Sequence, residues 1–138
     1  MSPGWRSLFS PQHKPGAFGR QIEQAGAKYL QQHGLRLVDQ NYHCRRGEID
    51  LVMREQELLV FVEVRFRRSA TFGDGAESVT HTKQLKLVAA ARHYIQSRGL
   101  GETLCYRFDV LAVTASGSTQ SQLQFSWIQD AFQLNNQP

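Results

Sequence analysis

The chain has 138 residues, with 16 Lys or Arg against 12 Asp or Glu and a formal net charge of +4. Hydrophobic residues make up 41%, a share typical of a single folded domain and too high for a disordered chain. Two cysteines cannot build a disulfide scaffold, and no apolar run approaches the roughly 20 residues needed to cross a bilayer. We expect no secretory signal and no membrane contact, hence a cytoplasmic protein.

Three of the four prolines fall within the first 15 residues, and none lies between residues 17 and 137. This break predicts a flexible basic N-terminal arm over residues 1–16, a folded domain over 17–130 and a short tail over 131–138. The mildly basic charge is a weak sign of nucleic-acid binding, because many basic proteins bind no polyanion.

The first predicted element is a helix from Arg20 to His33, with Gly34 after its end. Glu23 shares a face of this helix with Ala27 and Leu30, so its carboxylate should border the buried side. Along the rest of the chain we expect a short strand at 35–38, a polar turn or irregular strand at 41–47, strands at 49–53 and 58–66, a glycine-containing loop at 72–75, a helix at 82–97 and strands at 107–114 and 123–128.

This order of helix, three strands, helix and further strands predicts an α/β fold, with a mixed central sheet flanked by helices. The strands at 49–53 and 58–66 are apolar on both faces, which is typical of central strands covered on both sides. In the second helix, a stripe of side chains at helical spacing is expected to face the core: Leu85, Val88, Ala89, Arg92 and Ile95.

Asp50 and Glu63 are the informative residues, because charged side chains are rare in doubly covered strands. A two-residue turn at Gln56 and Glu57 would place these two acids directly opposite each other, with Cβ atoms about 5 Å apart. Arg65 follows Glu63 by two residues and should project to the same face.

Two adjacent, poorly solvated carboxylates need a counter-charge to ionise together. One solution is a Mg²⁺ ion, which would polarise a phosphate and activate water for attack on it. The other solution is a purely structural cluster, with Arg65 as the fixed partner of both acids. Glu23 favours the metal site, since a third acid bordering the core also needs a partner.

A larger pattern surrounds these acids. The segments GEIDLV at 47–52 and VFVEVR at 60–65 are preceded by Gly19 and Glu23 at GxxxE spacing, and are followed by Phe72-Gly73 and by RFDV at 107–110. The sequence resembles the UPF0102 (YraN-like) family, which is similar to the restriction-endonuclease-like, or PD-(D/E)xK, superfamily and to Holliday-junction resolvases. The resemblance covers roughly residues 17–130 and implies an αβββαβ core.

By this resemblance, Glu23 corresponds to the helix acid, Asp50 to the metal-binding aspartate and Glu63 to the acid of the (D/E)xK motif. All three would hold Mg²⁺ or Mn²⁺. Arg65 stands where the motif has lysine. An arginine keeps the positive charge and can hold a phosphate, but it does not exchange a proton. The substitution therefore bears on catalysis more than on binding.

Five basic residues near the acids are candidates for phosphate contact, although a solvated surface role is as common for such side chains: Arg45, Arg46, Arg67, Arg68 and Lys83. Two other acids have simpler interpretations. Glu48 is expected to be an exposed acid at the entrance of a strand, and Asp109 is expected to pair with Arg107 or with a neighbouring strand.

Together these features favour a Mg²⁺-dependent endonuclease acting on nucleic acid, with DNA, including branched or structured DNA, preferred over RNA. A homodimer would suit the cutting of two strands. Two alternatives stay open. One is a non-catalytic nucleic-acid-binding module with a degenerate site, in keeping with Arg65, and the other is a protein-interaction domain whose buried acids are structural.

Overall fold

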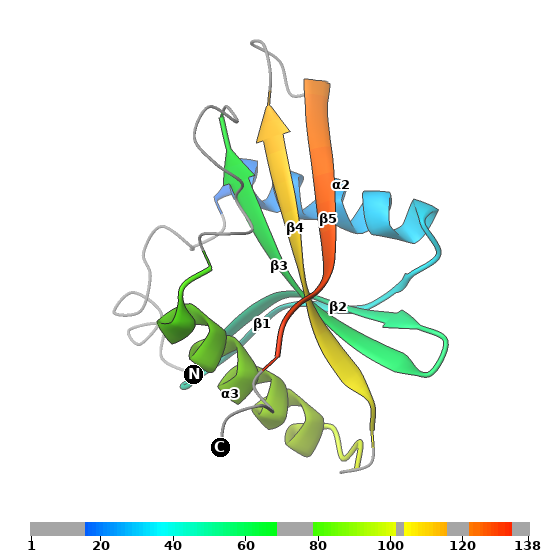
Figure 1. Cartoon of the computed structure of the whole chain (residues 1–138), viewed down its shortest axis with the longest axis vertical. Helices are drawn as coiled ribbons and strands as arrows, with labels where there is room; N and C mark the ends of the chain where they lie inside the picture. Colours follow the sequence, from blue (N-terminus) through cyan, green and yellow to red (C-terminus); the bar gives the residue numbers. More distant parts are fainter. Residues whose placement is uncertain (1–15, 69–78, 102–103, 116–121, 134–138) are drawn as a thin grey trace.

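The computed structural model describes residues 16–68, 79–101, 104–115 and 122–133. Within these ranges the chain forms two helices and five strands (Figure 1). In chain order they are α2 (Ala17–Gln32), β1 (Arg36–Cys44), β2 (Gly47–Glu55), β3 (Leu58–Arg67), α3 (His81–Ser97), β4 (Tyr106–Ala115) and β5 (Leu123–Phe132). The predicted loop at 72–75, and the predicted arm apart from Gly16, lie outside the described residues.

The strands form one sheet in the order β1-β2-β3-β4-β5. β3 and β4 are parallel, and the other neighbouring pairs are antiparallel, so the sheet is mixed. The parallel pair requires a crossover, and α3 provides it. The α/β class and the predicted order of elements are confirmed.

Helix α2 extends three residues further toward the N-terminus than predicted and ends at Gln32. Gly34, at φ 100°, adopts the left-handed conformation that ends the helix. The buried side of the helix consists of Ile22, Gly26, Ala27 and Leu30. Gly26 allows a close approach to β4, because a Cβ at this position would lie 2.9 Å from Cδ2 of Leu111.

The prediction for the segment after α2 was right only in part. Of the turn and the irregular strand left open for residues 41–47, the strand is the one observed over 41–44. It is continuous with the strand predicted at 35–38, so that residues 36–44 form a single strand with an irregularity in its pairing to β2 between Leu37 and Asp39. β1 is an edge strand, and most of its side chains are at least partly exposed. Its polar sequence therefore reflects solvent on one face rather than a turn.

The predicted stripe on the second helix was right only in part: Val88 is buried and Ile95 packs against the same core. Leu85 is 48% exposed and Arg92 is exposed. The side of α3 that packs on the sheet instead carries Leu87, Val88, Ala90, Ala91 and Tyr94. The small side chains of Ala90 and Ala91 let the helix backbone approach the strands, so packing selects a different face from the one that hydrophobicity alone favoured.

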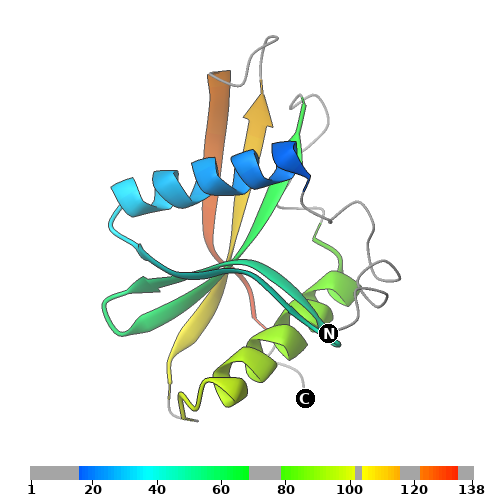
Figure 2. The same ribbon diagram turned by 180° about the vertical axis from the view of Figure 1, so that it is seen from behind.

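The two helices cover opposite faces of the twisted sheet, as Figures 1 and 2 show from the two sides. One core packs β-strand side chains such as Ile49 and Phe61 against α3, and the other packs Leu51, Val62 and Leu111 against α2. Among the described residues, neither helix has the length and hydropathy of a membrane-spanning segment.

The β2–β3 hairpin turns at Gln56 and Glu57, as predicted, and Gln56 takes the left-handed φ of 56°. Its ladder runs from Glu55↔Leu58 to Leu51↔Val62. Beyond that pair the strands diverge, because β3 continues along β4 while β2 bends away with β1 (Figure 1). We call the diverging ends, residues 47–50 of β2 and 63–67 of β3, the β2–β3 fork.

Candidate active site at the fork

Asp50 and Glu63 are the first residues past the end of the β2–β3 ladder. The register predicted from the two-residue turn is confirmed, but the two strands separate at this point. The carboxylate of Asp50 bridges them, since its Oδ2 accepts a hydrogen bond of 2.8 Å from the backbone N–H of Val64. Glu63 is only 5% exposed. The fork therefore holds one acid from each strand.

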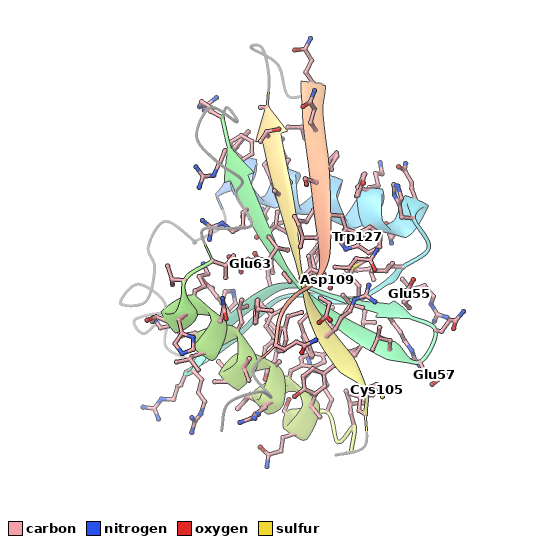
Figure 3. The ribbon with its side chains drawn as sticks, viewed as in Figure 1. Glu55, Glu57, Glu63, Cys105, Asp109 and Trp127 are labelled. Carbon is pink, nitrogen blue, oxygen red and sulfur yellow. The ribbon has the colours of Figure 1, made fainter. Side chains whose placement is uncertain are left out.

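Helix α3 contributes a cation to the same place. Nζ of Lys83 lies 2.9 Å from Oε2 of Glu63, and Figure 3 shows Glu63 on β3 next to the first turn of α3. The sequence suggested Lys83 only as a phosphate contact. The ion pair was missed because no local spacing connects two residues 20 positions apart on different elements.

Glu23 reaches the site from α2. Its Oε1 is buried and has no hydrogen-bond partner among the described residues, as expected for an acid that borders the core. The pKa of Glu23 is raised to about 7: burial is the largest cause, a hydrogen bond with Asn41 opposes the shift, and the negative charges of Glu48 and Glu63 add to it. Glu23 is therefore easily protonated near neutral pH.

The pKa of Asp50 is also raised well above its ordinary value. Burial is the largest cause, followed by the charges of Glu63 and Glu23, while the Val64 N–H and the Lys83 ammonium act in the opposite direction. The charges of Glu63 and Glu23 thus act on Asp50, and that of Glu63 also acts on Glu23, so the three acids share one electrostatic environment. Three elements that are distant in the sequence each supply one acid.

Glu48 also belongs to this environment. Its side chain is 26% exposed, with Oε1 2.8 Å from Nδ1 of His43. The expectation of an exposed acid was therefore wrong. His43 lies opposite Glu48 in the β1–β2 ladder, which brings the two side chains into contact.

The donor chemistry of the site fits a hard divalent cation, because carboxylate oxygens are the ligands such ions prefer and one of them is buried without a partner. Within the described segments, no three His, Cys, Asp or Glu side chains already stand as a metal-holding group. Glu63 instead forms an ion pair with Lys83. A cation would have to draw the carboxylates together against that ion pair.

Arg65 lies on β3, two residues beyond Glu63, and is partly exposed. Side chains two apart on a strand project to the same face, so the predicted orientation toward the acids agrees with the strand geometry. The role of this arginine in the site stays a prediction.

The four other predicted phosphate contacts lie at the two ends of the fork. Two of them, Arg45 and Arg46, are exposed in the turn between β1 and β2. Arg67 is the last residue of β3 and is partly exposed, and Arg68 follows it and is exposed. Each strand of the fork thus has two arginines at its outer end.

Comparison with known proteins places the chain in a family. The model of the uncharacterised protein family UPF0102 matches residues 22–113. A UPF0102 protein of Nitrosococcus oceani is 47% identical over 118 residues, covering 86% of this chain and 93% of that protein. One from Chromohalobacter salexigens is 50% identical over 114 residues, covering 83% and 89%, and one from Aeromonas hydrophila is 44% identical over 133 residues, covering 96% and 95%. The chain belongs to the UPF0102 family.

Membership confirms the resemblance seen in the sequence, and the matched range of UPF0102 contains Glu23, Asp50, Glu63 and Lys83. The family description assigns no activity. A proposal for the function of this protein therefore depends on the chemistry of the fork.

Asp109, the other acid inside an apolar strand of this UPF0102 protein, is structural. Its carboxylate accepts hydrogen bonds from Nε of Arg107 at 2.9 Å, from the indole N–H of Trp127 at 2.9 Å and from the backbone N–H of Asp130 at 2.8 Å. Figure 3 places Asp109 on β4 beside Trp127 of β5. The expected pairing with Arg107 is confirmed.

Proposed function

We propose that this protein binds nucleic acid and hydrolyses its phosphodiester bonds with the help of Mg²⁺ or Mn²⁺. The observation that carries the proposal is the convergence of Glu23, Asp50 and Glu63 at the fork, where burial and mutual repulsion raise the pKa values of Glu23 and Asp50. A buried cluster of acids that disfavours its own ionisation is stabilised by a bound cation.

Glu23, Asp50 and Glu63 would hold the cation. When bound, it would supply positive charge that polarises the scissile phosphate and makes water a better nucleophile. Asp50 is fixed for this task by its hydrogen bond to Val64, and Glu63 is fixed by its place in the sheet. Glu23 must lose its proton to take part, so cation affinity should rise as pH increases through about 7.

The arginines at the ends of the fork would position the nucleic acid. Phosphate contacts from such side chains fix the register of a substrate without reading its sequence. Arg65, next to the acids, would hold the scissile phosphate or its neighbour. We favour DNA, including branched DNA, and a homodimer would let two strands be cut together.

The first experiment is a cleavage assay on branched, single-stranded and duplex DNA and on RNA, with Mg²⁺, Mn²⁺ or EDTA. The wild type should cut at least one substrate in a metal-dependent manner. Asp50→Asn should reduce cleavage at least about 100-fold, since cation chemistry supplies several kcal/mol. Glu57→Gln is the matched control, because Glu57 lies in the hairpin turn and its side chain is 95% exposed.

Other results would favour the alternatives. Salt-dependent binding of nucleic acid without cleavage or metal dependence would point to a non-catalytic binding module. An absence of both cleavage and binding would leave a protein-interaction domain with structural acids. Cleavage that survives Asp50→Asn unchanged would show that the activity does not come from this site.

A further inference from the structure

Helix α3 places an ammonium group against the most deeply buried acid of the fork, at 2.9 Å from Glu63. We propose that Lys83 supplies the positive charge that the lysine of the (D/E)xK motif would supply. The motif position of this chain holds Arg65, so the lysine comes from α3 instead. Phosphodiester cleavage would then depend on Lys83 rather than on Arg65. This inference rests on the proposed nuclease function and names a further residue of the same site.

The backbone around Lys83 is well fixed. Thr80 caps the helix, and its Oγ1 accepts a hydrogen bond of 3.1 Å from the N–H of Lys83. The side chain of Gln84 donates to the carbonyl of Val79 at 3.1 Å. The next turn packs so closely on β2 that a Cβ on Gly47 would lie 2.9 Å from the backbone oxygen of Lys86. The first turn of α3 is therefore held at the fork.

The environment suits a charge that must act on a reacting phosphate. The side chain of Lys83 is 27% exposed and that of Glu63 is 6% exposed, so their interaction is partly shielded from water. The same ammonium also influences Asp50 across the fork. Lys83 thus acts on the acids of both strands, from a third element.

The chemistry requires a compact ammonium group that can lie close to the reacting phosphate, and it requires no proton transfer by that group. In hydrolysis, a water oxygen bonds to phosphorus while the bond to the leaving oxygen breaks. The water releases one proton to solvent and the leaving oxygen takes one up. Negative charge grows on the phosphate oxygens during this step, and a compact ammonium donor close to them lowers its energy. An ammonium carries three donors, so a contact with Glu63 is compatible with one to phosphate.

The test compares single-turnover cleavage by four proteins: the wild type, Lys83→Met, Lys83→Met combined with Arg65→Lys, and Lys86→Met. We expect Lys83→Met to lower the cleavage rate at least 100-fold with DNA affinity changed less than threefold. Lys86→Met removes the same charge from an exposed position on the same helix and should keep at least half of the rate. The double variant should recover at least tenfold, because a lysine at position 65 shares the strand face of Glu63.

Three results would overturn the inference. The first is an active wild type together with a Lys83→Met variant whose cleavage rate lies within fivefold of the wild-type rate. This result would contradict the role of Lys83 but not the nuclease function. The second is a double variant no faster than Lys83→Met, which would make the loss a packing effect. The third is an inactive wild type, which removes the nuclease proposal and this inference with it. If Lys83→Met does not fold, Lys83→Arg preserves the charge and should still lose at least tenfold, because a planar guanidinium does not replace a compact ammonium.

Discussion

The strands of this protein contain two kinds of buried acid, which differ in how their negative charge is compensated by neighbouring groups. Asp109 is fully satisfied by Arg107, Trp127 and the Asp130 backbone, so its negative charge stabilises the β4–β5 pair. Asp50 has a raised pKa and repulsive neighbours. A partnered acid of the first kind needs no ligand, whereas an acid of the second kind is costly to keep unless it binds something.

Glu23 allows the clearest test on a single side chain. Glu23→Gln should raise the free energy of unfolding of the metal-free protein at pH 8 by about 1–2 kcal/mol, and change it little at pH 4.5. The shift of the Glu23 pKa from 4.5 to about 7 sets an upper limit of about 3 kcal/mol, which partial solvation reduces. Urea unfolding at the two pH values measures the difference.

Glu57→Gln serves as the control here as well, and should change stability by less than about 0.5 kcal/mol at either pH. An equal loss of stability at both pH values in Glu23→Gln would show instead that the carboxylate of Glu23 stabilises the fold through its contact with Asn41.

Among the helices and strands, the site depends on how closely α3 approaches β2. Gly47 begins β2 and has no room for a Cβ, because the backbone oxygen of Lys86 would lie 2.9 Å from it. A backbone oxygen cannot swing aside as a side chain can. Any larger residue at this position must push the helix outward, and Lys83 lies on the turn before the contact.

Gly47→Ala should therefore lower the free energy of unfolding by about 1–3 kcal/mol, measured by urea denaturation. Gly19→Ala is the matched control. Gly19 lies in α2, and among the described residues beyond its own stretch of helix nothing lies within 4 Å of the position that a Cβ would take there, so the control should gain roughly 0.5–1 kcal/mol from helix propensity. A neutral Gly47→Ala would mean that α3 adjusts without cost.

In the molecule as a whole, the fork exists because the sheet changes partners along its length. β2 leaves β3 to follow β1, while β3 remains paired with β4 as far as Arg67. α3 covers one face and α2 the other, and each sends a charged side chain to the point of divergence. Four elements thus define a site that none of them contains alone.

This arrangement predicts how stability depends on pH and metal. The raised pKa of Glu23 means that its contribution to stability is fully present below its unfolded pKa of 4.5 and is lost as pH rises through about 7. The raised pKa of Asp50 makes stability change with pH in the same direction. At pH 8 a divalent cation at ten times its dissociation constant should add about 1.4 kcal/mol, or roughly 3–6 °C in Tm. At pH 5 protons should compete with the cation and reduce this gain.

Thermal unfolding with Mg²⁺, Mn²⁺ or EDTA at the two pH values measures this effect. Asp50→Asn should abolish the cation-dependent rise at pH 8, whereas Glu57→Gln should keep it. A rise of equal size at both pH values, or one that Asp50→Asn retains, would locate cation binding elsewhere on the protein.

Local sequence was enough to predict the order of elements, the hairpin register and the two acids past its end. These follow from short-range signals: alternation of apolar residues, a two-residue turn, and a glycine after a helix. The same local patterns left the polar part of β1 undecided between a turn and a strand, and they misled for part of α3, where Leu85 faces solvent and Ala90 faces the sheet.

The folded chain was needed to learn that Lys83 pairs with Glu63, that Glu23 influences the ionisation of Asp50, and that Glu48 is partly shielded. The first two of these interactions join elements far apart in the chain, and the third accompanies the pairing of β1 with β2, which places His43 opposite Glu48. Their geometry is set by sheet twist and by the depth at which helices pack, which are properties of the assembled fold. No spacing along a single strand or helix encodes them.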